Sequence, residues 1–285
     1  MFEEVNRKKK KYEVGIIIGG IIVGLAAISY LPIGSSGGPV IMVFVALGIG
    51  AIIMGICKSK IKIISNEFKM VYVQKELEKV FPNSTYHFDR GFAQSEITES
   101  RLLKSRDRYS SEDMIVGEFD GVHFKSSDVT QKEVRGSGKH RRVVTVFQGR
   151  VYEFDFNKVF KYNLLILQKG QFRPFENFVK IEMESIQFNS ELKVYAKNDH
   201  EAFYILTPQF MEKLMELDRK YYDKITFSFL NNKLYIAVDN RVDNFDIKPF
   251  QIVDSSILRS YVEEFEDMKG FITLLNLTSR MFKEF

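Results

Sequence analysis

The chain has 285 residues, 45% of them hydrophobic, with 41 basic and 37 acidic side chains and a formal net charge of +4. Only eight basic and three acidic residues precede Ile63, so the rest of the chain is nearly neutral, with 33 basic and 34 acidic residues. A strongly basic face of the kind that binds nucleic acid is therefore not expected. The single cysteine, Cys57, excludes an intrachain disulfide and a cysteine-rich zinc site.

Two uncharged apolar runs lie near the start of the chain, from Val14 to Leu31 and from Val40 to Cys57. Eighteen helical residues span about 27 Å, close to the roughly 30 Å of bilayer hydrocarbon. The sequence predicts a basic N-terminus over residues 1–13 and a transmembrane helical hairpin over 14–57, with a short external turn at 32–39. The alternative, a secretory signal peptide, is disfavoured because a second spanning run follows the first.

Basic residues flank both runs, whereas the turn between them carries no charge. The positive-inside rule therefore predicts a multi-pass protein of the cell membrane with both termini in the cytoplasm. Lysine and arginine at these positions also attract anionic lipid headgroups. The juxtamembrane basic residues are Arg7, Lys8, Lys9, Lys10, Lys11, Lys58, Lys60 and Lys62.

Small residues recur four positions apart within both runs, a spacing that lets helix backbones approach closely in lipid. It favours packing of the two spans against each other or of two copies in a homo-oligomer. The ordinary abundance of glycine in membrane helices is the alternative interpretation. The pairs are Gly15 with Gly19, Gly20 with Gly24, Ala46 with Gly50, and Ala51 with Gly55.

Beyond the hairpin, apolar residues at helical spacing predict a juxtamembrane helix over residues 58–82, closed by Pro82. Residues 83–175 are predicted to form a mostly β subdomain. Asp120-Gly121 predicts one hairpin turn, residues 135–140 predict the tip of a second hairpin, and Gly149 predicts a bulge.

Residues 176–285 are predicted to form an α+β subdomain that ends in a helix. Strands are expected at Val179–Ile186 and Leu192–Tyr195, then a helix over 207–222 and a hairpin around Asn231-Asn232. The final helix should run from about Asp254 toward Phe282. Its apolar seam suits either packing on its own domain or a two-chain coiled coil, and Gly270 should weaken or break it. The seam residues are Leu258, Tyr261, Phe265, Met268, Ile272, Leu275 and Phe282.

The predicted fold class is therefore α+β, an N-terminal two-helix transmembrane hairpin followed by a cytoplasmic domain of curved antiparallel sheet with flanking helices. The chain also carries a series of landmarks in this order: the basic start and paired spans, Leu102 with Ser105-Arg-Asp-Arg-Tyr109, Glu112-Asp113, Gly117, Val146-Phe-Gln-Gly149 with Asp155-Phe-Asn157, and Ala202-Phe-Tyr-Ile-Leu-Thr-Pro208. Their order resembles that of prokaryotic domain-of-unknown-function family 3137. The resemblance implies a membrane-anchored cytoplasmic architecture and brings no activity or catalytic residue with it.

The chain offers few chemical motifs. His87, His123, His140 and His200 are scattered, and Gly136-Ser-Gly-Lys139 lies between strands, which favours a hairpin tip over a phosphate loop. We predict no catalytic, cofactor-binding or metal-binding residue. The densest polar cluster comprises Arg106, Asp107, Arg108, Tyr109, Glu112 and Asp113. Its alternating charges favour internal ion pairs that fix a loop, and recognition of a polar ligand or partner is the alternative.

The leading functional hypothesis is a non-enzymatic, membrane-tethered binding or scaffold protein whose cytoplasmic sheet engages a protein partner or a lipid headgroup. One alternative is a membrane-associated enzyme whose site is assembled from distant residues, which a deep cleft of convergent polar groups would favour. The other is an oligomeric structural membrane protein.

Overall fold

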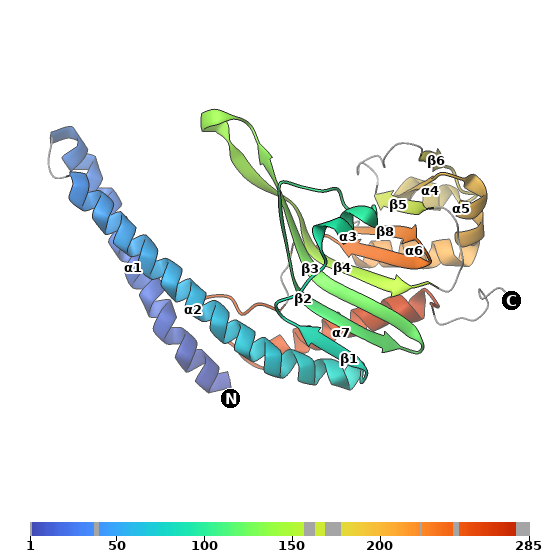
Figure 1. Cartoon of the computed structure of the whole chain (residues 1–285), viewed down its shortest axis with the longest axis horizontal. Coiled ribbons are helices and arrows are strands. Elements are labelled where there is room, and N and C mark those ends of the chain that lie inside the picture. The colour runs from blue at the N-terminus through green and yellow to red at the C-terminus, as the bar shows by residue number, and fades with distance from the viewer. Residues whose placement is uncertain are drawn as a thin grey trace. The chain divides into compact units, whose positions relative to one another are not determined.

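A computed structural model of the protein describes residues 2–36, 40–156, 163–168, 178–222, 224–241 and 245–277. Two long apolar helices precede a nine-stranded antiparallel sheet with flanking helices, which confirms the predicted α+β class (Figure 1). The chain divides into two compact units. The helical unit comprises Met1–Lys75 and Phe245–Tyr261, and the sheet unit comprises Glu76–Asn244 and Val262–Phe285.

The first two helices are α1 (Phe2–Ser36) and α2 (Val40–Val80). Both contain stretches that are long and apolar enough to cross a membrane, within Phe2–Ser29 and Ile41–Val80. Residues 32–36, predicted as part of a turn, instead continue α1, and residues 37–39 lie outside the described residues. The predicted juxtamembrane helix is the continuation of α2, which ends two residues before Pro82 because proline disfavours helical geometry in the residue that precedes it.

Glycines bring α1 and α2 together. A Cβ on Gly19 would lie 2.9 Å from the Gly50 carbonyl oxygen, and a Cβ on Gly50 would lie 2.8 Å from the Gly19 carbonyl oxygen. A Cβ on Gly15 would lie 2.5 Å from the Cys57 Sγ. Gly19 and Gly50 therefore let the two helices of one chain approach closely, because a side chain at either position would push the backbones apart. Gly15 leaves room for the Cys57 side chain.

The other small residues of the hairpin have different surroundings. A Cβ placed on Gly20, Gly24 or Gly55 would meet no atom within 4 Å. Ala51 is exposed and Ala46 is half-buried. Some of the regularly spaced small residues therefore lie between the two helices, and the others lie outside that contact.

The sheet unit contains one continuous sheet with the strand order β1-β2-β3-β4-β9-β8-β5-β7-β6. Because β5 lies between β8 and β7, the sheet crosses the predicted boundary between residues 175 and 176. The strands are β1 (Ser84–His87), β2 (Arg108–Phe119), β3 (Val122–Arg135), β4 (Arg142–Asp155), β5 (Leu164–Gln168), β6 (Val179–Ile181), β7 (Leu192–Ala196), β8 (Ile225–Leu230) and β9 (Lys233–Val238).

Both predicted two-residue hairpin turns are present. Asp120 and Gly121 have φ of 50° and 78°, and Asn231 and Asn232 have φ of 51° and 60°. Positive φ at both central positions matches the twist of the flanking strands. The predicted tip at 135–140 joins β3 to β4 and contains the short 3-10 helix η1 (Gly138–His140).

The bulge in β4 was predicted at the wrong residue. The register changes from Gln131 opposite Phe147 to Lys132 opposite Thr145, which leaves Val146 as the extra residue. Gly149 instead lets the backbone of β4 lie close to that of β9, since a Cβ at Gly149 would lie 1.9 Å from the Val238 carbonyl oxygen.

The remaining helices are α3 (Gln94–Glu99), α4 (Ile186–Glu191), α5 (Asp199–Ile205), α6 (Pro208–Lys220) and α7 (Ser255–Leu274). The predicted cap of α6 is confirmed, because the Thr207 side chain accepts a hydrogen bond from the Phe210 amide. The strand predicted over 179–186 ends at Ile181, and Ser185 caps α4 instead. The final helix runs through Gly270 to Leu274, and Phe282 lies outside the described residues.

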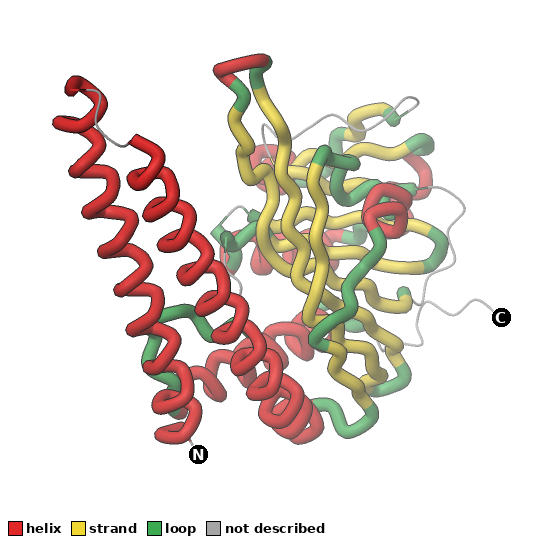
Figure 2. The backbone as a smooth tube through the Cα atoms, turned by 60° about the vertical axis from the view of Figure 1, so that its left-hand side comes forward, coloured by secondary structure: helices red, strands yellow, loops and turns green. Residues whose placement is uncertain are grey.

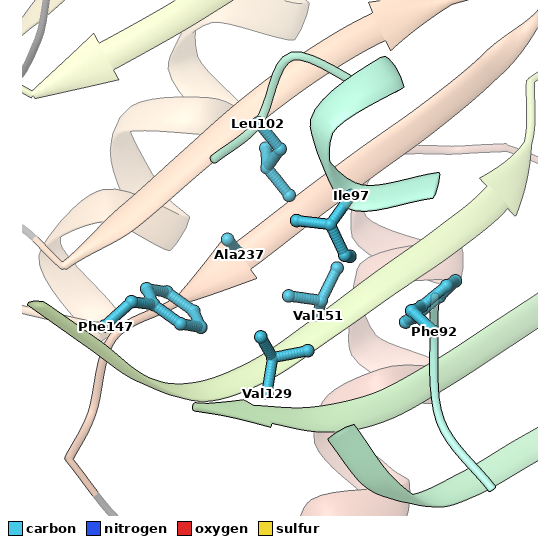
Figure 3. Packing of buried hydrophobic residues seen from close by; sticks show 7 residues of the cluster. All are labelled: Phe92, Ile97, Leu102, Val129, Phe147, Val151 and Ala237. Atoms are coloured by element: carbon cyan, nitrogen blue, oxygen red, sulfur yellow. The ribbon is translucent and has the colours of Figure 1, made fainter. Parts of the chain in front are cut away.

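Apolar side chains cover both faces of the sheet. On one face, the rings of Tyr152 and Phe154 lie 4.9 and 6.1 Å from the ring of Phe271 in α7. On the opposite face, α3 and the loop after it complete a cluster of Phe92, Ile97, Leu102, Val129, Phe147, Val151 and Ala237 (Figure 3). The tube view shows the segment that leads into α3 running along the strands (Figure 2). The sheet unit is therefore a layered domain with the sheet at its centre.

Candidate functional site

A cavity of about 150 Å³ opens on the face of the sheet that carries α3. Its apolar floor includes Leu102, Phe147 and Ala237, which also belong to the cluster in Figure 3. Polar side chains border it: Lys104, Arg106, Gln131, Lys224, Thr226 and Asp239. Because sites for drug-sized ligands usually occupy roughly 300–1,000 Å³, this cavity fits only a small group, such as a single side chain or part of a headgroup.

Hydrogen bonds fix the loop that forms one wall of the cavity. The Ser228 hydroxyl donates to the Ser100 carbonyl oxygen at 2.5 Å, and the Gln131 side chain donates to the Lys104 carbonyl oxygen at 2.9 Å. The Gln94 side chain donates to the Arg106 carbonyl oxygen, also at 2.9 Å. These hydrogen bonds join side chains of the sheet and of α3 to carbonyl oxygens of the loop, and they give the wall of the cavity a defined shape.

The rim of the cavity carries more cations than anions. Arg106 Nη1 lies 3.1 Å from Glu133 Oε1, and Asp239 Oδ1 lies 3.0 Å from Arg241 Nε. Lys224 is exposed and has no ion partner within the part of the chain that the structure describes. An unpaired ammonium beside an apolar floor suits a group that combines an anion with an apolar portion.

The polar cluster predicted from the sequence does not converge on this cavity. Only Arg106 borders it. Asp107 Oδ2 accepts a hydrogen bond from the Val134 amide at 2.7 Å, which ties the start of β2 to the end of β3. Arg108 is exposed, and Glu112 lies opposite Asp128 in the β2–β3 ladder.

Two members of that cluster are internal. The Tyr109 hydroxyl donates to the Phe92 carbonyl oxygen at 2.7 Å, and burial raises the pKa of Tyr109 to about 12. Asp113 is fully buried at a bulge in β2, has a φ of 59°, and accepts a hydrogen bond from the Tyr86 hydroxyl. These side chains hold the fold together and are not arranged to receive a ligand.

A buried polar network surrounds Arg150 on the face of the sheet next to α7, and no local motif predicted it. Arg150 is 2% exposed, and its guanidinium lies 3.0 Å from Asp128 Oδ1 and 3.6 Å from Glu264 Oε1. It also donates to the Asp113 carbonyl oxygen at 2.9 Å. Burial opposes the charge of Arg150, but the two carboxylates outweigh that effect and raise its pKa.

Tyr152 completes this network by donating a hydrogen bond from its hydroxyl to Glu264. Burial and the neighbouring carboxylate raise the pKa of Tyr152 well above its ordinary value. A charge that is paired and hydrogen-bonded in this way is typical of a structural ion pair. Among the described residues, no group of three or more His, Cys, Asp or Glu side chains is arranged to hold a metal ion.

The juxtamembrane basic residues fall into two groups within the helical unit. Some are engaged by acidic partners: Lys8 Nζ lies 2.9 Å from Glu4 Oε1, Lys9 Nζ lies 2.8 Å from Glu13 Oε1, and Lys62 Nζ lies 3.8 Å from Asp246 Oδ2. The others are exposed and have no ion partner among the described residues: Arg7, Lys10, Lys11, Lys58 and Lys60. The exposed group is therefore free to meet anions from outside the chain.

A family model matches part of the chain. Residues 145–277 match the family described as Protein of unknown function (DUF3137), the family expected from the order of the sequence motifs. No curated protein matches the chain. Among solved structures, the crystal structure of the mycobacterial trehalose monomycolate transport factor A, TtfA, aligns with 7% identity over 72% of this chain and 96% of that chain, with a TM-score of 0.38. A likeness at this level carries no argument about function.

Proposed function

Because residues 145–277 match a family of unknown function, DUF3137, we propose the role of the protein from its geometry alone. The protein is anchored in the cell membrane by α1 and α2, with both termini in the cytoplasm. Its sheet unit binds a protein partner or a lipid headgroup at the membrane surface. The tether raises the effective concentration of the sheet unit near other membrane components.

The observation that carries this proposal is the exposure of the apolar helices. Only 11% of the most apolar window of each helix is buried, whereas the core helix of a soluble protein is mostly buried. An exposed apolar surface of this extent is costly in water and is satisfied by lipid. The exposed large side chains include Val14, Ile17, Ile21, Leu25, Ile28, Ile41, Phe44, Ile49, Ile52 and Ile56.

The exposed cations support the proposed orientation. Arg7, Lys10 and Lys11 precede the apolar part of α1, and Lys58 and Lys60 follow that of α2. The positive-inside rule places such flanks in the cytoplasm. Each cation near an anionic leaflet contributes about 1 kcal/mol of attraction.

The orientation can be tested by labelling single cysteines in intact cells. In a Cys57→Ala background, Ser35→Cys lies in the predicted external turn and Ser137→Cys lies at the exposed tip between β3 and β4. A membrane-impermeant maleimide should label the cysteine at position 35 in intact cells and the cysteine at position 137 only after lysis. Labelling at position 137 in intact cells would contradict the proposed orientation.

The binding role can be tested by crosslinking from the rim of the cavity in native membranes. A photoreactive residue in place of Lys224 should give a discrete adduct with a protein or a lipid. The same residue in place of Glu212, which is exposed on α6, is the matched control. Equal and diffuse products from both positions would count against a binding site at the cavity.

A further inference from the structure

Residues 245–254, here called the strap, return to the helical unit from far along the chain. The side-chain amide of Asn6 donates to the Val253 carbonyl oxygen at 2.8 Å and accepts from the Val253 amide at 2.9 Å. At the other end of the strap, the Ser65 hydroxyl oxygen accepts from the Ile247 amide at 2.9 Å. Both helices therefore hold the strap by hydrogen bonds to its backbone.

A turn at the centre of the strap lies at the start of the first apolar run. Lys9, which is 2% exposed, donates to the carbonyl oxygens of Lys248 and Gln251. Glu13 accepts a hydrogen bond from the Phe250 amide at 2.7 Å. Because Glu13 immediately precedes Val14, these bonds fix the backbone of Phe250 beside the cytoplasmic end of the proposed span.

The conformation of this turn does not suit the residue that occupies it. The Gln251 amide donates to the Lys248 carbonyl oxygen at 3.3 Å, with Pro249 second and Phe250 third in the turn. Phe250 has a φ of 64°, at the position where a type II turn ordinarily carries glycine. Its side chain is 57% exposed, and that of Ile252 is 74% exposed. Packing within the unit therefore accounts for neither the choice of phenylalanine nor its exposure.

We propose that Phe250 and Ile252 insert into the interfacial layer of the cytoplasmic leaflet and form a third contact with the membrane beside the two spans. This inference rests on the proposed membrane anchoring. Exposed apolar residues of α1, including Val14 and Ile17, follow directly after Glu13, whose carboxylate accepts a hydrogen bond from the Phe250 amide.

The charges around the turn suit the same location. Lys10, Lys11 and Lys248 are exposed and have no ion partner among the described residues. Aromatic and aliphatic side chains next to lysines are typical of segments that lie in the headgroup region of an anionic membrane. A backbone conformation that disfavours phenylalanine, kept in an exposed turn, is the kind of local strain found at binding sites.

Because the sequence contains no tryptophan, a single introduced tryptophan can report how deeply its position lies in the membrane. The full chain is reconstituted in vesicles of phosphatidylglycerol and phosphatidylcholine with brominated acyl chains, which quench tryptophan fluorescence on contact. Phe250→Trp and Ile252→Trp report on the turn, and Ile21→Trp reports on the span. Val71→Trp is the matched control, because Val71 is 58% exposed but lies thirteen residues beyond Lys58, or about 20 Å farther along α2.

The tryptophans at positions 250 and 252 should be quenched by brominated lipid, with emission shifted to the blue, and should be protected from iodide. The tryptophan at position 71 should show the reverse. If positions 250 and 252 behave like position 71 while position 21 is quenched, the inference is overturned and the membrane anchor stands. If position 21 is not quenched, the proposed anchoring fails and the inference fails with it.

A second variant separates membrane contact from a purely structural role. Phe250→Gly removes the backbone strain of the turn, because glycine adopts a positive φ without steric cost, so the melting temperature of the full chain should not fall. In the Ile252→Trp background, the same change should weaken quenching by brominated lipid, because half of the proposed contact is lost. A lowered melting temperature with unchanged quenching would show that Phe250 serves the fold and would overturn the inference.

Discussion

Replacing Arg150 by methionine should strongly destabilise the sheet unit. The guanidinium lies 3.0 Å from Asp128 and 3.6 Å from Glu264, and both carboxylates are largely buried. Methionine fills similar space but leaves these two charges without their cation. The carbonyl oxygen of Asp113 and the hydroxyl of Ser126 also lose a donor.

The expected magnitude follows from this geometry. Removing one partner of a buried ion pair costs about 3–5 kcal/mol, because the remaining charge stays buried without compensation. For a domain of about 200 residues, each kcal/mol lowers the melting temperature by about 2–4 °C. Arg150→Met should therefore lower the melting temperature by roughly 6–20 °C.

The assay is thermal unfolding of the full chain in lipid nanodiscs, followed by circular dichroism in the β-sheet region. Arg142→Met is the control, because Arg142 is exposed at the start of the same strand, β4. Adding Asp128→Asn and Glu264→Gln to Arg150→Met removes the two carboxylate charges that have lost their cation, and it should recover part of the lost melting temperature. If Arg150→Met melts at the same temperature as Arg142→Met, or if the triple variant is no more stable than the single one, the reasoning about buried charge is wrong.

Three further predictions concern glycine and tyrosine. Gly149→Ala should unfold at lower denaturant concentration, because its Cβ would lie 1.9 Å from the Val238 carbonyl oxygen; an unchanged midpoint would contradict the close approach. Gly270→Ala should raise the stability of α7 by about 1 kcal/mol, because its Cβ meets open space within a helix; a lower midpoint would show an unrecognised contact. Burial raises the pKa of Tyr109 and Tyr152 in the folded state above the unfolded-state pKa of about 10. Their contribution to stability is therefore complete below about pH 10 and is lost as the pH rises toward the folded-state pKa values, because the unfolded chain loses these protons first. Denaturant unfolding should accordingly show stability falling above about pH 10, and a constant midpoint there would refute the assignment.

Local signals in the sequence predicted much of the fold. The turns at Asp120-Gly121 and Asn231-Asn232, and the cap at Thr207, depend on residues next to one another in the chain, and all three are confirmed. The short helices α3, α4 and α5 were missed because six or seven residues complete fewer than two turns and give no clear apolar period.

The polar contacts of the interior could not be predicted for a different reason. Lys9 lies between Lys8 and Lys10, and only the position of the strap distinguishes the buried lysine from its exposed neighbours. Arg150 is in a strand where a charged residue ordinarily faces water, and its partner Glu264 lies more than a hundred residues away. The cavity likewise combines Leu102, Lys224 and Asp239 from separate segments.

The strap also sets an order of events during synthesis. Asp246, whose carboxylate lies 2.6 Å from the Nζ of the fully buried Lys69, follows that lysine by 177 residues. At about 5–20 residues per second, the ribosome needs roughly 9–35 s to produce the partner after the lysine. The two apolar helices, proposed above to span the bilayer, can insert during this interval, before the strap that contacts Lys9 and Lys69 has been made. The base of the helical unit is therefore completed only after nearly all of the sheet has been made, and a chain interrupted before residue 245 lacks the Asp246 carboxylate that pairs with Lys69.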